Sequence, residues 1–155
     1  MSRVVNADNV GTQRQRLRRT IAEALRRLMA KGDLDEEARD LAALIVFSLR
    51  EIDDGIEQTT AAWEKRDYYL KADRFRQDWL WVTPSADEME KILRQGAWER
   101  LPAALAKLLP YFSDITINRM VRNNNELWDG CYQRLLNSPP GSTGRAATRL
   151  SPATT

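Results

Sequence analysis

GDLDEEARDLAALIVFSLREIDDGIEQTTAAW, residues 32–63, is the stretch of sequence that decides the fold. Its large or inward-facing residues recur at steps of three or four positions. They are Leu41, Ile45, Leu49, Ile52, Ile56, Thr59 and Trp63. This spacing places them on one face of an α-helix, which predicts an amphipathic helix packed along one stripe against a core.

The two ends of this helix differ in how strongly the sequence marks them. Gly32 is suited to ending a preceding helix in the left-handed conformation, and Asp33 with Glu36 forms a capping-box pattern for the next one. No comparable stop follows until Pro84. The pattern therefore favours one long central helix over about residues 35–82, roughly 72 Å long at 1.5 Å per residue. The alternative is two separate helices, and the weakest points are Gly55 and the pair Thr59-Thr60.

Helical periodicity also extends to both sides of this central helix. An earlier helix begins at about Thr12 and turns a basic outer face to solvent. Later helices begin near Pro84, near Trp98 with Pro102 in the first turn, and at Ser113 or Asp114, the last running to Leu135. The sequence thus predicts an all-α helical bundle of about five helices.

The composition changes at both ends of the chain. Residues 1–11 are expected to form a flexible N-terminal arm, and residues 12–136 a single helical domain. From Asn137 the sequence is rich in Ser, Thr, Pro and Gly, and Leu150 is its one large apolar residue. Because such a segment buries little surface to offset the entropy of ordering, residues 137–155 are predicted to be a disordered tail.

Charge is distributed unevenly along the chain. Residues 1–31 hold eight Lys and Arg against two acids, a net +6, whereas residues 32–136 hold fourteen basic and twenty acidic residues, a net −6. The basic face either pairs with the acidic body of the same chain or meets phosphates, and the first interpretation is favoured. The candidate phosphate-binding residues are Arg16, Arg19, Arg26 and Arg27.

Aromatic residues are concentrated in the second half of the long predicted helix. A single neighbouring helix would not cover all of them, because they point in several directions around the helix axis. Trp and Tyr also dominate the energetics of protein interfaces. The predicted interface residues are Trp63, Tyr68, Tyr69, Phe75, Trp79 and Trp81. The function this favours is a non-enzymatic interaction or adaptor protein that self-associates through the long helix or binds a partner protein. A nucleic-acid-associated protein using the basic first helix is the alternative.

The chemistry that the sequence allows is narrow, because histidine is absent and Cys131 is the single cysteine. This excludes imidazole catalysis, imidazole metal sites and intrachain disulfides. Glu37 with Asp40 and Glu51 with Asp54 have a spacing that suits Mg²⁺. It resembles that of the all-α nucleotide pyrophosphohydrolases without assigning the family. A Mg²⁺-dependent nucleotide-processing enzyme is the third candidate; no catalytic residue, metal ligand or cofactor is assigned.

The location of the protein is expected to be cytoplasmic. The chain starts without the apolar segment of a secretory signal, and its longest apolar run, Leu41–Leu49, is far below the roughly 20 residues of a membrane-spanning helix. No membrane partner is predicted.

Overall fold

The computed structural model describes residues 7–117 and 125–144, and within these ranges every regular element is a helix. This confirms the predicted all-α helical bundle. The elements are α1 (Ala7–Ala30), α2 (Glu36–Lys65), α3 (Tyr69–Asp78), α4 (Val82–Gln95), η1 (Trp98–Arg100), α5 (Leu101–Leu108), η2 (Leu109–Phe112), η3 (Asn125–Leu127) and α6 (Cys131–Leu136).

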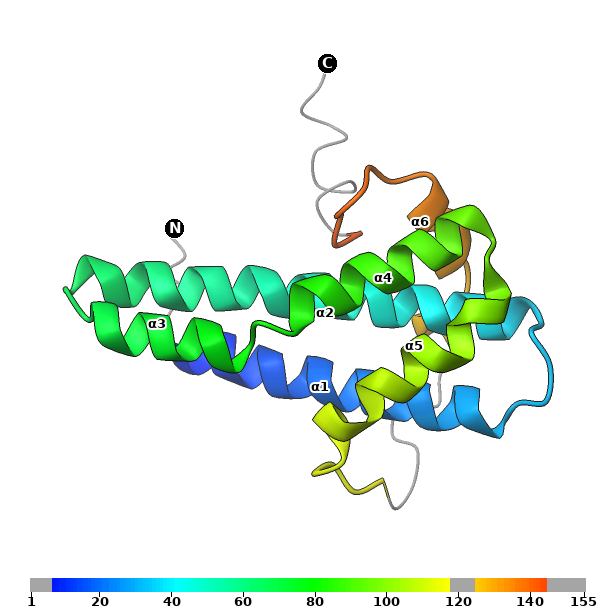
Figure 1. Cartoon of the computed structure of the whole chain (residues 1–155), viewed down its shortest axis with the longest axis horizontal. Coiled ribbons are helices and arrows are strands. Elements are labelled where there is room, and N and C mark those ends of the chain that lie inside the picture. The colour runs from blue at the N-terminus through cyan, green and yellow to red at the C-terminus, as the bar shows by residue number, and fades with distance from the viewer. Residues whose placement is uncertain (1–6, 118–124, 145–155) are drawn as a thin grey trace.

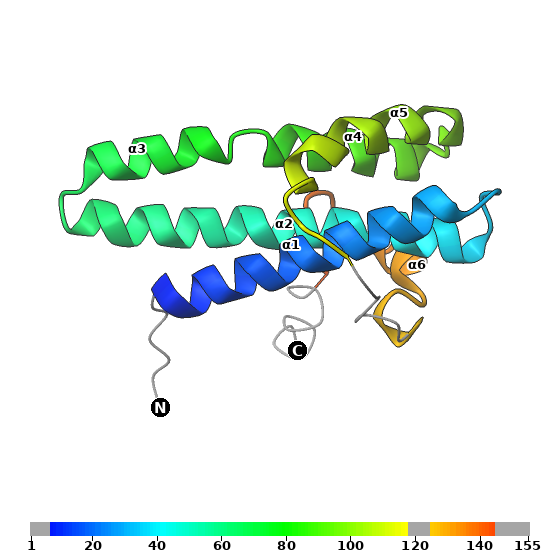
Figure 2. The same ribbon diagram turned by 90° about the horizontal axis from the view of Figure 1, so that it is seen from below.

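The centre of the bundle is α2, which contacts α1, α3, α4 and α6. Figures 1 and 2 show α1 along one side of α2, with α3 and then α4 along another. The predicted stripe is buried as expected, since Leu41, Ile45, Leu49 and Ile52 are each at most 1% exposed. Burial of these apolar side chains is the main force that assembles the bundle.

The first helix begins earlier than predicted. α1 starts at Ala7, so residues 7–11 belong to the helix and not to a flexible arm, while residues 1–6 lie outside the described residues. Val10 packs beside Gly55, where an added Cβ would lie 3.3 Å from the Val10 Cγ1 atom. α2 continues through Gly55 as one helix, and the missing side chain lets α1 approach closely.

The start of α2 is capped by a different residue from the one the sequence suggests. Asp35, not Asp33, is the N-cap, and its carboxylate accepts a 2.8 Å hydrogen bond from the Ala38 backbone N–H. Gly32 does not adopt the left-handed conformation. The link between α1 and α2 is instead held by Lys31, whose Nζ lies 2.6 Å from Glu37 and 3.0 Å from Asp35.

The single long helix predicted over 35–82 is wrong, because α2 ends at Lys65 and the chain reverses into α3. The Asp67 N–H donates to the Glu64 carbonyl at 3.0 Å, and the Tyr68 N–H donates to the Trp63 carbonyl at 2.9 Å. These bonds form a Schellman motif around Asp67, which has a φ of 65°. Asp tolerates this left-handed conformation better than most residues, so the helix ends without glycine or proline.

The helices after α3 follow the sequence expectations more closely. α4 ends at Gln95, and the next residue, Gly96, is a left-handed C-cap with a φ of 67°. Pro102 lies in the first turn of α5. Proline has no backbone N–H, and this costs nothing there because the first N–H groups of a helix have no partner within the helix. Thr83 does not cap α4, which begins one residue earlier. Its hydroxyl donates to Asp53 of α2 at 2.9 Å.

The last predicted helix is much shorter than expected. Residues 113–117 are not helical, residues 118–124 lie outside the described residues, and the chain continues as η3 and α6. Asp40 of α2 accepts hydrogen bonds from the backbone N–H groups of Gly130 at 3.1 Å and Tyr132 at 2.9 Å. A side chain from α2 thereby satisfies N–H groups that the start of α6 would otherwise leave without acceptors.

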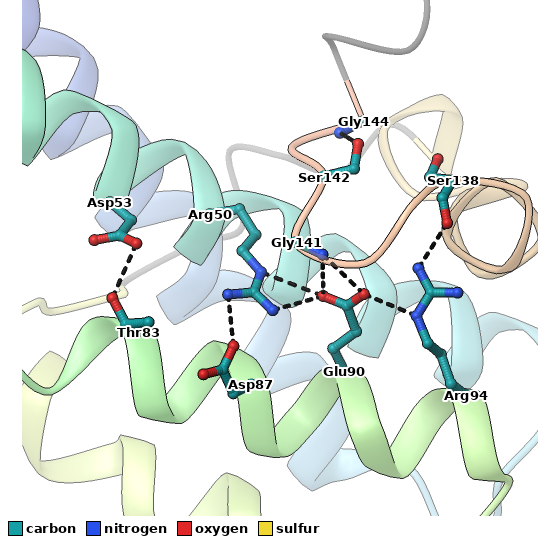
Figure 3. A network of polar contacts seen from close by, with 10 residues as sticks. All are labelled: Arg50, Asp53, Thr83, Asp87, Glu90, Arg94, Ser138, Gly141, Ser142 and Gly144. Carbon is teal, nitrogen blue, oxygen red and sulfur yellow. Dashed lines mark hydrogen bonds and ion pairs between the residues drawn. The ribbon is translucent and has the colours of Figure 1, made fainter.

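The segment after α6 is docked rather than disordered, at least to Gly144. Figure 3 shows Glu90 of α4 at the centre of a network in which it accepts hydrogen bonds from Arg50 (2.7 Å), Arg94 (2.8 Å) and the Gly141 N–H (3.2 Å). Arg94 also donates to the Ser138 carbonyl at 2.8 Å. The predicted tail is therefore wrong for residues 137–144, called the strap below, while residues 145–155 lie outside the described residues.

A search of the described helices for a membrane span finds none that combines sufficient length with sufficient apolar character.

Candidate interaction surface

Most of the predicted interface aromatics pack within the chain, as a continuous row that joins α2, α3, α4 and η2. Trp63 meets Phe75 edge to face at 5.1 Å, and Phe75 lies 6.2 Å from Trp79. Trp79 lies 6.0 Å from Trp81, which stacks on Tyr111 at 4.0 Å. Phe75, Trp79 and Trp81 are half-buried and pack against the core of their own chain. Trp63 is also half-buried, through its contact with Phe75.

Arginines of α1 cover the outer side of this aromatic row. The Arg14 guanidinium lies 4.9 Å from the ring centre of Phe75 and 5.6 Å from that of Trp79. Arg18 lies 5.6 Å from the ring of Phe112 and forms a 2.6 Å ion pair with Asp114. Part of the positive charge of α1 thus contacts aromatic rings and an acid of the same chain. This agrees with the favoured interpretation, in which the basic face pairs within the chain.

The remaining two predicted interface residues, Tyr68 and Tyr69, lie at the turn between α2 and α3. Tyr68 is 49% exposed, Tyr69 56% and the following Leu70 65%. This turn lies at one end of the bundle, opposite the end that carries α5 and α6 (Figures 1 and 2). We call Asp67–Arg74 with Trp63 the hairpin tip. Its side chains border an open hollow of about 730 Å³.

The hairpin tip is held firmly on α2, although its outer side chains are exposed. Arg76 of α3 forms a 2.9 Å ion pair with Glu64 of α2. This hydrogen bond lowers the pKa of Glu64 below its usual value. The Lys71 ammonium lies 4.4 Å from the Trp63 ring centre. The fold therefore presents Tyr68, Tyr69 and Leu70 from a fixed backbone, which reduces the entropy lost when a partner binds.

Two charged residues of opposite sign flank these apolar side chains. Asp67 precedes Tyr68, and Arg74 follows Leu70 by one helical turn. Both side chains are exposed and border the hollow. Within the described part of the chain, neither side chain makes a hydrogen bond or an ion pair. Their charges are therefore available to a partner.

The four candidate phosphate-binding residues do not form one free basic face. Arg19 makes a 2.9 Å ion pair with the buried Glu23. Arg27 lies 4.8 Å from the Trp128 ring and 3.9 Å from Glu37. Arg16 and Arg26 remain exposed. Only these two of the four arginines point freely to solvent, which weakens the structural support for a phosphate-binding helix.

The predicted acidic pairs have other partners. Glu37 binds Lys31, and Asp40 accepts the two N–H groups at the start of α6. Glu51 and Asp54 lie farther along the same helix, α2. Across residues 7–117 and 125–144, no group of three or more acidic or cysteine side chains is placed to hold a metal ion.

Cys131 lies in the core at 0% exposure, where it packs at the start of α6. Burial raises the pKa of its thiol. A buried thiol with a raised pKa is a poor nucleophile and behaves as a small apolar residue, as the sequence suggests.

The sequence did not identify Asp67, Leu70 and Arg74 of the hairpin tip as interface residues. In a continuous helix they would be ordinary surface positions, because nothing in the local pattern marks the reversal at Asp67. The one indication of an exposed site was the pair Tyr68 and Tyr69. Neighbouring residues on a helix point in different directions, so both cannot pack on the same core face.

Comparisons with protein-family models, with curated proteins and with solved structures find no match for this chain.

Proposed function

We propose that this chain is a non-enzymatic interaction protein whose partner, a protein, binds the hairpin tip. The observation that carries this proposal is the exposure of three consecutive large side chains, Tyr68, Tyr69 and Leu70. Single exposed apolar residues are ordinary on a protein surface, whereas adjacent ones on a fixed turn are typical of a contact site. Tyr is also among the residues that contribute most to binding energy.

The charge around the tip favours a protein over a nucleic acid. The residues bordering the hollow include Lys71 and Arg74 but also Asp67 and Asp78, so the two signs balance. A phosphate backbone selects surfaces with a clear positive excess. Of the four candidate phosphate-binding arginines, Arg16 and Arg26 are the exposed ones, and no observation on the described residues favours them over the hairpin tip.

Site-specific photo-crosslinking in the cell that makes this protein tests the proposal. A photoreactive phenylalanine analogue at Tyr69 is expected to give a discrete protein adduct. The same analogue at Lys107, an exposed position on α5, is expected to give none. An adduct that a nuclease removes, or no adduct at Tyr69 beyond that at Lys107, would contradict the proposed function.

A further inference from the structure

We infer that the occupant of the hairpin tip is a second copy of this chain, bound about a two-fold axis that passes near Tyr69 and Leu70. This inference rests on the proposed function, because it identifies the partner of the same surface. It follows from the order of charges along the tip. Along the chain Asp67 precedes the apolar residues and Arg74 follows them, both border the same hollow, and neither forms an ion pair with another described residue.

This order makes the surface complementary to itself. When two copies meet with α3 antiparallel, the Asp67 carboxylate of each copy lies opposite the Arg74 guanidinium of the other. Two identical ion pairs then enclose a centre made of Tyr69 and Leu70 from both copies. A two-fold contact in which one patch meets itself is the commonest arrangement in homo-oligomers. The parallel arrangement would place like charges together.

Two other charged residues of the tip already have partners within the chain. Lys71 is directed over the Trp63 ring, and Asp73 lies 3.5 Å from Arg76. The contact is small, because three exposed side chains per copy form its centre. Small interfaces belong to weak complexes, so dimerisation is expected in the micromolar range of dissociation constants.

Charge reversal provides the test, with sedimentation equilibrium of the full chain as the measurement. Arg74→Asp places two acids opposite each other at both ion pairs, and Asp67→Arg places two bases there. Each variant alone is expected to raise the dimer dissociation constant about tenfold or more. An equimolar mixture is expected to restore association, because one copy then supplies both acids and the other both bases. Arg100→Asp, the same change at an exposed position on η1, is the control and leaves the constant unchanged.

Asp67→Arg needs a second, milder variant beside it, because a long side chain is strained at the φ of 65° that Asp67 adopts. Asp67→Asn keeps the left-handed conformation and removes the charge. Because the dimer then loses both ion pairs, its dissociation constant is expected to rise about threefold. Arg74→Asp lies on the exposed side of α3 and is expected to fold normally.

The outcomes separate this inference from the proposed function. A monomer at all concentrations up to the millimolar range overturns the second copy as partner, while an adduct of another mass at Tyr69 would leave the proposed function standing. A dimer that Tyr69→Ala weakens but that neither charge reversal changes overturns the antiparallel arrangement alone. Restoration by the mixture supports the inference, since two independently damaged folds would not repair each other.

Discussion

Glu90→Gln is expected to lower the free energy of unfolding by about 3 kcal/mol, the largest loss anticipated for a single polar substitution in this chain. Glu90 is 4% exposed and accepts hydrogen bonds from α2, from α4 and from the strap. The amide preserves the shape of the side chain but removes its charge. The Arg50 and Arg94 guanidinium groups then lose the carboxylate that compensates their burial.

Thermal unfolding measures this loss, with a decrease of about 9 °C in the midpoint expected for a chain of this size. Asp87→Asn is the matched control. Its carboxylate also binds Arg50, at 2.9 Å, but its side chain is 62% exposed, so water screens the pair. A loss of less than about 1 kcal/mol is expected there. Equal losses for the two variants would show that burial of Glu90 does not determine its contribution.

The contribution of Glu90 is also expected to depend on pH. Burial by itself would raise the pKa of Glu90, but the hydrogen bonds from Arg50, Arg94 and the Gly141 N–H outweigh it, so the pKa lies below the usual value. A carboxyl with a lowered folded-state pKa stabilises the fold fully above its unfolded-state pKa, about 4.3, and loses this effect as pH falls through the folded-state pKa. The difference in urea midpoint between wild type and Glu90→Gln should therefore be constant from pH 7 to 5 and shrink below about pH 4. A difference that does not change with pH would contradict the assignment to charge.

Trp81→Ala is expected to destabilise the fold by about 3 kcal/mol and to leave self-association of the folded protein unchanged. Trp81 stacks on Tyr111 with their ring planes 8° apart and meets Phe112 edge to face at 5.8 Å. It thereby joins the α3–α4 link to η2. Substitution removes these contacts and leaves a cavity in the aromatic row.

The matched variant is Tyr69→Ala, which removes an exposed aromatic from the hairpin tip. Its free energy of unfolding should stay within about 0.5 kcal/mol of wild type, while its dimer dissociation constant rises. Urea unfolding and sedimentation of both variants measure the two effects separately. Dissociation of a stably folded Trp81→Ala protein would contradict the division of the aromatics into packing and interface residues.

The stripes of the helices could be predicted from the sequence because apolar spacing reports burial directly. Leu41, Ile45 and Leu49 lie in the core as expected. The end of α2 could not be predicted. Asp67 supplies the left-handed conformation that sequence patterns associate with glycine, and nothing local distinguishes it from the other surface acids.

The strap could not be predicted for a different reason. Its composition gives little apolar surface to bury, and disorder was predicted for that reason. The strap is instead held through its backbone, by the Gly141 N–H on Glu90 and the Ser138 carbonyl on Arg94, and Gly144 fits against Phe47. These contacts depend on where α4 places its side chains, which no pattern within residues 137–144 reveals.

The candidate interface could be predicted only in part. The sequence located the aromatic concentration correctly, and Tyr68 and Tyr69 remain the proposed contact residues. Four of the six residues pack on other aromatics of the same chain, and three of them, Phe75, Trp79 and Trp81, lie against the core. The reversal at Asp67 explains this, because it brings α3 back onto α2 and lets Phe75 pack on Trp63. A local pattern does not show whether an aromatic residue packs on its own chain or on another.

Amide hydrogen exchange of the unmodified protein at low and high micromolar concentration tests most directly whether the hairpin tip is the contact surface. At short labelling times, peptides covering residues 66–74 are expected to exchange more slowly as the concentration rises, while peptides from α4 and α5 do not change. Exchange at residues 66–74 that is independent of concentration, in a protein that nevertheless associates, would place the contact elsewhere and contradict the account.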